Sequence, residues 1–196
     1  MKVTCPLPSI GRRETKALPS AGPSAARYDF RADPVLGAAL DYWRLKRGVR
    51  CMPQRRDIEP AELREVLAHL QITEAIDGGS RFRYRLVGTA IVDAFGAEFT
   101  GKYVDELVSG ERDCFVHACY RAVCASRRPA FVRSKYVSTR NVDLIANRVL
   151  LPLSENGDAV NQILGALTFE FTRPLRGRVG HEAQIDLSAS YVDLLE

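Results

Sequence analysis

Residues 71–86 read QITEAIDGGSRFRYRL, which is the pattern of a β-hairpin. Two runs of strand-forming residues, 71–76 and 81–86, flank the turn Asp77-Gly78-Gly79-Ser80, whose residues tolerate the positive φ of a tight hairpin. Side chains alternate in the second run, so one face is polar and the other faces a core. The polar face carries Arg81, Arg83 and Arg85, and the core face carries Phe82, Tyr84 and Leu86. The stretch therefore predicts two antiparallel strands.

Two helical patterns precede this hairpin. Asp33 fits an N-cap and Pro34 fits the first helical position, and apolar residues then recur at helical spacing as far as Gly48. Pro60 opens a second, shorter pattern over residues 61–70. The sequence therefore predicts two N-terminal flanking helices.

Helical patterns and then strand patterns follow the hairpin. One helix is bounded by Thr89 and Gly96, and a longer one covers residues 112–126. Three further strands are predicted at residues 130–137, 144–153 and 163–171. Two strands, a helical crossover and three closing strands make an α+β domain with a five-stranded antiparallel sheet, covered mainly on one face.

The chain of 196 residues is long enough for one domain with a core of its own. Residues 1–33 are basic and rich in Pro, Ser, Ala and Gly, and they cannot bury enough apolar surface to offset the entropy of ordering. We expect a disordered tail there that folding does not require. The domain is expected at residues 34–172, followed by a C-terminal tail at residues 173–196.

The composition excludes several classes of protein. Hydrophobic residues make up 46% of the chain and charged residues 27%, which are ordinary globular values. Five cysteines are too few and too scattered for a disulfide scaffold. No apolar run approaches the about 20 residues of a membrane helix, and the N-terminus lacks the apolar stretch of a signal peptide. These features predict a cytoplasmic protein without membrane contact.

The net charge of +4 is unevenly distributed along the chain. Residues 1–56 hold 12 Lys and Arg against 4 Asp and Glu, whereas the remainder holds 16 against 20. The basic front end is compatible with an anionic partner such as nucleic acid or lipid. The simpler interpretation, which does not require nucleic acid, is that basic and acidic parts of one molecule contact each other.

Four separated motifs add a family resemblance to the order of elements. They read LDYW at residues 40–43, PQRRDIEP at 53–60, FRYRLVGT at 82–89 and FGAEFTGK at 95–102. The order is similar to that of a PAS domain, and the motifs resemble a PAS subfamily common in alphaproteobacteria, whose members are mostly stand-alone proteins of unknown role. The resemblance covers about residues 34–171. It implies a five-stranded sheet around a small-molecule pocket and assigns no ligand or reaction.

We expect no cofactor, metal or catalytic residue. Residues 96–103 have the glycines and lysine of a phosphate-binding loop, but Tyr103 replaces the Ser or Thr that would bind magnesium. Cys114 lacks the neighbours of a flavin-binding cysteine, and His117 lies on a helical face with arginines, which suits a solvated or pocket-edge histidine better than a haem ligand. These two residues alone are too few for zinc. A small α+β enzyme with an acid or base in its pocket remains an alternative function.

The resemblance implies a non-enzymatic sensory or regulatory module that acts in signalling by binding a protein partner. It leaves open whether the module also binds a small-molecule ligand. A nucleic-acid or anionic-surface binder that uses the basic front end is the alternative. The competing interpretation of the candidate ligand-binding residues is that they form the core. These candidates are Phe82, Tyr84, Ile91, Phe95, Phe115, Tyr120 and Phe169.

The first flanking helix predicts assembly. Its stripe includes Leu36, Leu40 and Trp43, and PAS domains commonly pair through such helices, so we expect a homodimer. The competing interpretation is that Trp43 packs wholly within its own chain. The arginines of the hairpin are expected to pack under this helix and to pair with Asp57, Glu59 or Glu170.

Overall fold

The computed structural model describes residues 28–107, 111–137, 143–171 and 184–196. Four α-helices and three short 3-10 helices lie within these ranges. The α-helices are α1 (Pro34–Arg47), α2 (Thr89–Phe95), α3 (Val104–Leu107) and α4 (Glu111–Ser126). The 3-10 helices are η1 (Arg55–Asp57), η2 (Pro60–Leu63) and η3 (Leu67–His69). The strands are β1 (Leu70–Ile76), β2 (Arg81–Val87), β3 (Ala130–Val137), β4 (Asp143–Leu153), β5 (Gln162–Phe171) and β6 (Gln184–Leu194).

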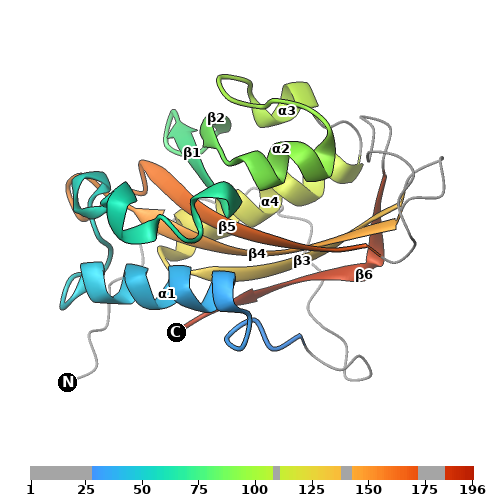
Figure 1. Cartoon of the computed structure of the whole chain (residues 1–196). Helices are drawn as coiled ribbons and strands as arrows, with labels where there is room; N and C mark the ends of the chain where they lie inside the picture. The colour runs from blue at the N-terminus through green and yellow to red at the C-terminus, as the bar shows by residue number, and fades with distance from the viewer. Residues whose placement is uncertain (1–27, 108–110, 138–142, 172–183) are drawn as a thin grey trace.

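The described strands form one sheet in the order β2-β1-β5-β4-β3-β6, and every neighbouring pair is antiparallel (Figure 1). This confirms the α+β class with an antiparallel sheet. All five predicted strands are present within one or two residues of their expected ends.

The expectation of five strands and a C-terminal tail is corrected by β6. This strand lies within the predicted tail and pairs along β3, from Ala130 opposite Leu194 to Val137 opposite Gln184. The register shifts between Arg133 and Lys135. Such a shift breaks the period-2 alternation by which a strand is recognised in a sequence.

Helices cover both faces of the sheet, not mainly one. Helix α1 packs against β4 and β5 on one face, and α4 packs across β2, β3, β4 and β6 on the other (Figure 1). Helices α2 and α3 lie on the same side as α4. The central strands are consequently buried on both faces.

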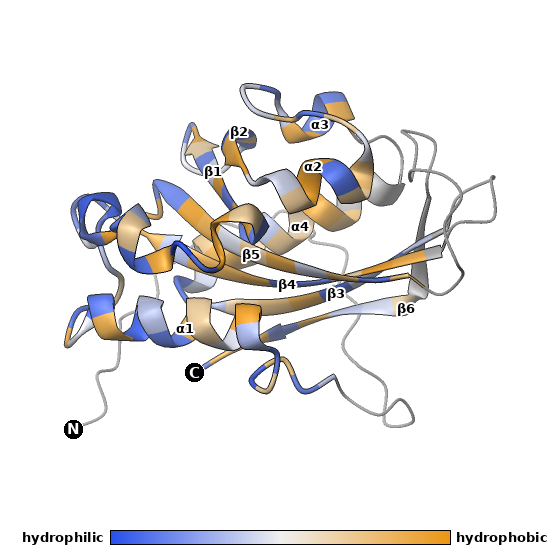
Figure 2. Cartoon of the chain, in the orientation of Figure 1, coloured by the Kyte–Doolittle hydropathy of each residue, from blue (hydrophilic) through white to orange (hydrophobic). Residues whose placement is uncertain are grey.

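Helix α1 has the bounds that the sequence predicts. The Asp33 carboxylate accepts hydrogen bonds from the backbone N–H groups of Val35 and Leu36, and Gly48 at the other end has φ 57°. Hydrophilic and hydrophobic stretches alternate along the helix (Figure 2). Its buried stripe, which faces the sheet, consists of Leu36, Ala39, Leu40 and Trp43. No α-helix in the described ranges is both long and apolar enough to span a bilayer.

Residues just before α1 belong to the packed structure, so the predicted tail boundary at residue 33 is too late. The rings of Tyr28 and Phe30 stack on Phe131 of β3, at centroid distances of 5.8 and 4.9 Å. The Asp33 carboxylate accepts hydrogen bonds from the Tyr28 hydroxyl and from Thr168 of β5. Residues 1–27 lie outside the described ranges.

The second predicted helix, residues 61–70, is not a single α-helix. The structure has η2 and η3 there, with Val66 between them at φ −117° and ψ 1°, and Leu70 already begins β1. The hairpin arginines also pair differently from the expectation. Arg81 pairs with Asp105 of α3 at 2.7 Å, and Arg83 pairs at 2.6 Å with Glu74, which lies opposite it on β1.

Candidate functional site

The predicted ligand-binding residues lie on two strands of the sheet and on two of the helices that cover one of its faces. Strand β2 supplies Phe82 and Tyr84, β5 supplies Phe169, α2 supplies Ile91 and Phe95, and α4 supplies Phe115 and Tyr120. All are buried except Phe95 and Phe169, which are partly buried.

Ring contacts bring several of these residues together. The Phe82 ring lies 5.0 Å from that of Tyr120, and the Phe95 ring lies 5.8 Å from that of Phe169. Phe95 also contacts the ring of Tyr136, at 5.3 Å. Ile91 is buried but lies outside the main hydrophobic cluster, so the structure does not join it to the others.

Sequence reasoning missed the most unusual residue on this face, Arg148 of β4. It lies opposite Val132 of β3 and Leu167 of β5, and it is only 6% exposed. Its Nη2 donates a 2.6 Å hydrogen bond to the hydroxyl of Tyr136. Its Nε has no hydrogen-bond partner among the described residues. A charged side chain buried to this degree normally has an ionic partner.

The groups around Arg148 do not neutralise it. Burial raises the pKa of Tyr84 well above its ordinary value. Burial also raises the pKa of Tyr120, although the charge of Arg148 opposes this rise. The pKa of the Cys119 thiol rises to about 12, because burial outweighs the attraction of Arg148. These three groups are therefore uncharged at neutral pH.

Tyr120 is fixed by polar groups from β1. The amide of Gln71 donates a 2.7 Å hydrogen bond to the Tyr120 hydroxyl, and Thr73 lies 3.4 Å from the same oxygen. Gly165 of β5 lies opposite Gln71, and a Cβ atom there would come within 2.7 Å of the Gln71 side chain. The missing side chain of Gly165 thus leaves room for Gln71 to reach the cluster.

Ser134 adds a second buried polar group without a described partner. Its side chain is fully buried, and its hydroxyl has no hydrogen bond to the described residues. Ser134 lies on β3 between Val132, the strand partner of Arg148, and Tyr136, its hydrogen-bond partner. Residues two apart on a strand share a face, so Ser134 faces the same side of the sheet as Arg148.

His117 is buried, 7% exposed, and its ring lies 5.5 Å from that of Phe82. This corrects the expectation of a solvated or pocket-edge histidine, because its part of α4 packs on β2. The side chain of Cys114 lies outside the described residues. Where side chains are described, no group of three or more His, Cys, Asp and Glu is placed to hold a metal ion.

The residues predicted for a dimer interface, Leu36, Leu40 and Trp43, are each at most 1% exposed within a single chain. The indole of Trp43 donates a hydrogen bond to the backbone of Pro152. The structure therefore agrees with the alternative in which Trp43 packs within its own chain. These three side chains offer no surface to a second copy.

The opposite face of the sheet carries a partly buried ion pair. The Arg133 guanidinium donates to Glu170 at 2.8 Å, and the Asn147 amide donates to the same carboxylate. The hydrogen bond from Arg133 lowers the pKa of Glu170, and burial only partly opposes this effect. Asp33 and Thr168 make a second contact on this face. This network needs no further ligand.

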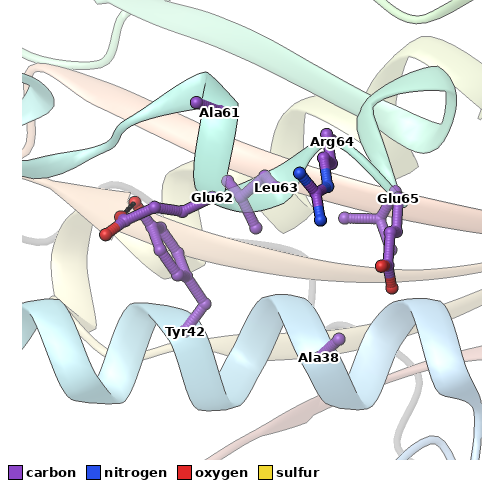
Figure 3. A pocket seen from close by; sticks show the side chains of 8 residues that line it. Ala38, Tyr42, Ala61, Glu62, Leu63, Arg64 and Glu65 are labelled. Carbon is purple, nitrogen blue, oxygen red and sulfur yellow. Dashed lines mark hydrogen bonds between the residues drawn. The ribbon is translucent and has the colours of Figure 1, made fainter.

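A surface pocket of about 410 Å³ lies between α1 and the segment of η2 (Figure 3). Tyr42 rises from α1 toward Glu62, and its hydroxyl donates a 2.8 Å hydrogen bond to that carboxylate. The same hydroxyl accepts from the Glu59 backbone N–H, and Lys46 pairs with Glu62 at 2.6 Å. These polar groups are therefore engaged with one another.

Cations of the basic front end contact acidic residues of the later chain. Lys46 pairs with Glu62, and Arg50 pairs with Asp57 at 2.7 Å. These contacts are what the simpler interpretation of the charge distribution expects. They leave correspondingly less free charge for an anionic surface.

One comparison with known proteins gives a match. A family model described as a PAS domain matches residues 32–168. This range covers most of the chain and includes every predicted ligand-binding residue except Phe169. Neither the curated proteins nor the solved structures contain a match.

Proposed function

Because the chain belongs to the PAS domain family, we propose that it is a sensory module that binds one small molecule between its sheet and α4 and reports this state to a protein partner. The observation that carries the proposal is the buried cluster around Arg148, which combines one charged group, several hydroxyls and aromatic rings. Ligand sites are typically apolar cavities with a few polar groups that fix orientation.

The connections of α4 support a route for the signal. This helix packs on β2 and β4 and also on β6, the strand at one edge of the described sheet. A ligand shifts a conformational equilibrium only if it binds two states unequally. In the proposal, the bound molecule changes how α4 sits on the sheet, and the edge at β6 presents that change to the partner.

The finer parts of the proposal rest on the sequence. Membership in the stand-alone subfamily common in alphaproteobacteria rests on the four motifs. A cytoplasmic, non-catalytic role rests on the composition and on the lack of complete sequence motifs for catalysis, metals or cofactors. Pairing with a second copy is retained because PAS domains commonly pair. It is assigned to surfaces other than Leu36, Leu40 and Trp43.

Native mass spectrometry of the purified full chain tests the proposal. We expect an extra mass of one small molecule per chain, which is lost on denaturation. Hydrogen exchange should then be slower in the loaded than in the stripped protein at α2, α4 and the β3–β4 pair, with α1 as the internal control. A chain without extra mass, whose melting temperature is also unmoved by a metabolite extract, contradicts the proposal. Protection confined to α1 contradicts it as well.

A further inference from the structure

Arg148 is buried, yet it differs in its pairing from three less buried arginines of the sheet. Arg81, Arg83 and Arg133 each pair with a carboxylate within 2.8 Å. Arg148 has no carboxylate within 4.0 Å among the described residues, and its hydrogen-bond partner is the hydroxyl of Tyr136. A guanidinium keeps its charge at any pH that a folded protein meets. Burial of one charge without its counter-charge is strongly unfavourable, and among the described residues this site lacks an anion.

The unused donors on this face fit a carboxylate. The Nε–H of Arg148 and the hydroxyl of Ser134 have no partner among the described residues, and both lie on the face that α4 covers. A carboxylate has two oxygens that accept hydrogen bonds, and a guanidinium binds it through two parallel N–H donors. A carboxylate bound there would accept a hydrogen bond from the Arg148 Nε–H and would also balance the positive charge of the guanidinium.

The surroundings set the class of the anion. One guanidinium balances one negative charge, so a phosphate dianion would leave an uncompensated charge in the same buried place. The aromatic rings of Phe82, Phe95 and Phe169 suit an apolar body attached to the charged group. We infer that the ligand is a small organic monocarboxylate whose carboxylate pairs with Arg148. This inference rests on the proposed function, because it names the ligand class of the same site.

Thermal shift and calorimetric titration of the full chain test the inference with defined probes. The probes are sodium benzoate and sodium hexanoate, their neutral amides benzamide and hexanamide, and inorganic phosphate, all at matched ionic strength. We expect at least one carboxylate to raise the melting temperature by more than about 3 °C at millimolar concentration, because a ligand that binds only the folded state stabilises it. The amide of the same body should move it by less than about 1 °C.

Two arginine variants give the matched comparison. Arg148→Met keeps much of the side-chain volume and removes the charge, so the ligand-free variant should melt at or above the wild-type temperature. Its affinity for the carboxylate should fall at least tenfold. Arg133→Met removes a paired arginine from the opposite face. That variant should melt lower than wild type and keep the carboxylate affinity.

Each other outcome contradicts the inference in a recognisable way. If an amide binds as tightly as its carboxylate, in wild type and in Arg148→Met, the charge pairing is wrong while the proposed ligand site stands. Binding of phosphate in place of the carboxylates overturns the monocarboxylate class. If no probe binds and ligand-free Arg148→Met melts well below wild type, Arg148 is a structural group of the core, and the inference fails.

Discussion

The indole N–H of Trp43 donates a 2.8 Å hydrogen bond to the backbone carbonyl of Pro152, and both residues are buried. The contact joins α1 to β4 across 109 residues of sequence. It fixes α1 on one face of the sheet while α4 occupies the other. The apolar stripe of α1, the helix expected to mediate pairing, therefore packs against its own chain.

Trp43→Phe should lower stability without changing the oligomeric state. The substitution keeps an aromatic ring and leaves the buried Pro152 carbonyl without its donor, which costs about 1–3 kcal/mol. Chemical denaturation and sedimentation measure the two effects. Leu45→Ala on the same helix is the control, because Leu45 is 76% exposed and its loss should change stability by less than about 0.5 kcal/mol. A folded, dissociated Trp43→Phe protein would instead support the dimer interface.

Two N-terminal truncations should differ in stability. Removal of residues 1–27 is expected to leave the melting temperature within about 2 °C of the full chain, given their composition. Removal of residues 1–33 also deletes the α1 N-cap Asp33 and the rings stacked on Phe131. That truncation should lower the melting temperature by more than about 5 °C. Equal melting temperatures would show that residues 28–33 contribute little.

The C-terminal strand should be essential for a stable sheet. Val192 of β6 is buried and lies opposite Val132, whereas Leu194 is 43% exposed. Val192→Ala should cost more than about 1 kcal/mol, and Leu194→Ala should cost less than about half of that. Truncation after residue 183 exposes the edge of β3 and should yield aggregating protein. A soluble truncated chain with wild-type stability would restore the interpretation of this segment as a tail.

Acid should destabilise the fold in part through Glu170. Its folded-state pKa lies below the ordinary 4.5 because Arg133 donates to it, so its ionised form stabilises the protein above that pH. This contribution is lost as the pH falls below 4.5 and through the folded pKa. Glu170→Gln should therefore show less stability than wild type at pH 7 and a smaller loss between pH 5 and about pH 3. The exposed Glu65→Gln serves as control and should follow the wild-type curve.

The sequence predicts the fold well where local chemistry is explicit. Asp33, Pro34 and Gly48 fix the ends of α1, and the turn after Ile76 fixes the hairpin. Strand β6 was missed because a register shift disturbs its alternation. The pairing of Arg81 and Arg83 was assigned wrongly, because strand patterns do not reveal which elements meet a given face.

The sequence indicates only the aromatic residues of the candidate site, and their role in ligand binding stays a prediction. Phe82, Tyr84 and Tyr120 were identified because they belong to the core-facing side of their elements. Arg148 was missed because β4 is buried on both faces, so its polar positions do not show which face they occupy. Asn147 and Arg148 within an otherwise apolar strand were nevertheless a signal. A charged residue in a strand buried on both sides requires a partner, and that requirement could have led to the site.

The most direct test is the nitrogen NMR signal of the Arg148 Nε–H group. Burial should slow its exchange with water, and Arg148→Met assigns it by loss of the peak. On titration with benzoate or hexanoate, we expect a saturable shift of this resonance, with the Nε–H signal of Arg133 on the opposite face unmoved. If the Arg148 signal stays unmoved while other residues saturate, or if the neutral amides produce equal shifts, the ligand carboxylate does not pair with Arg148.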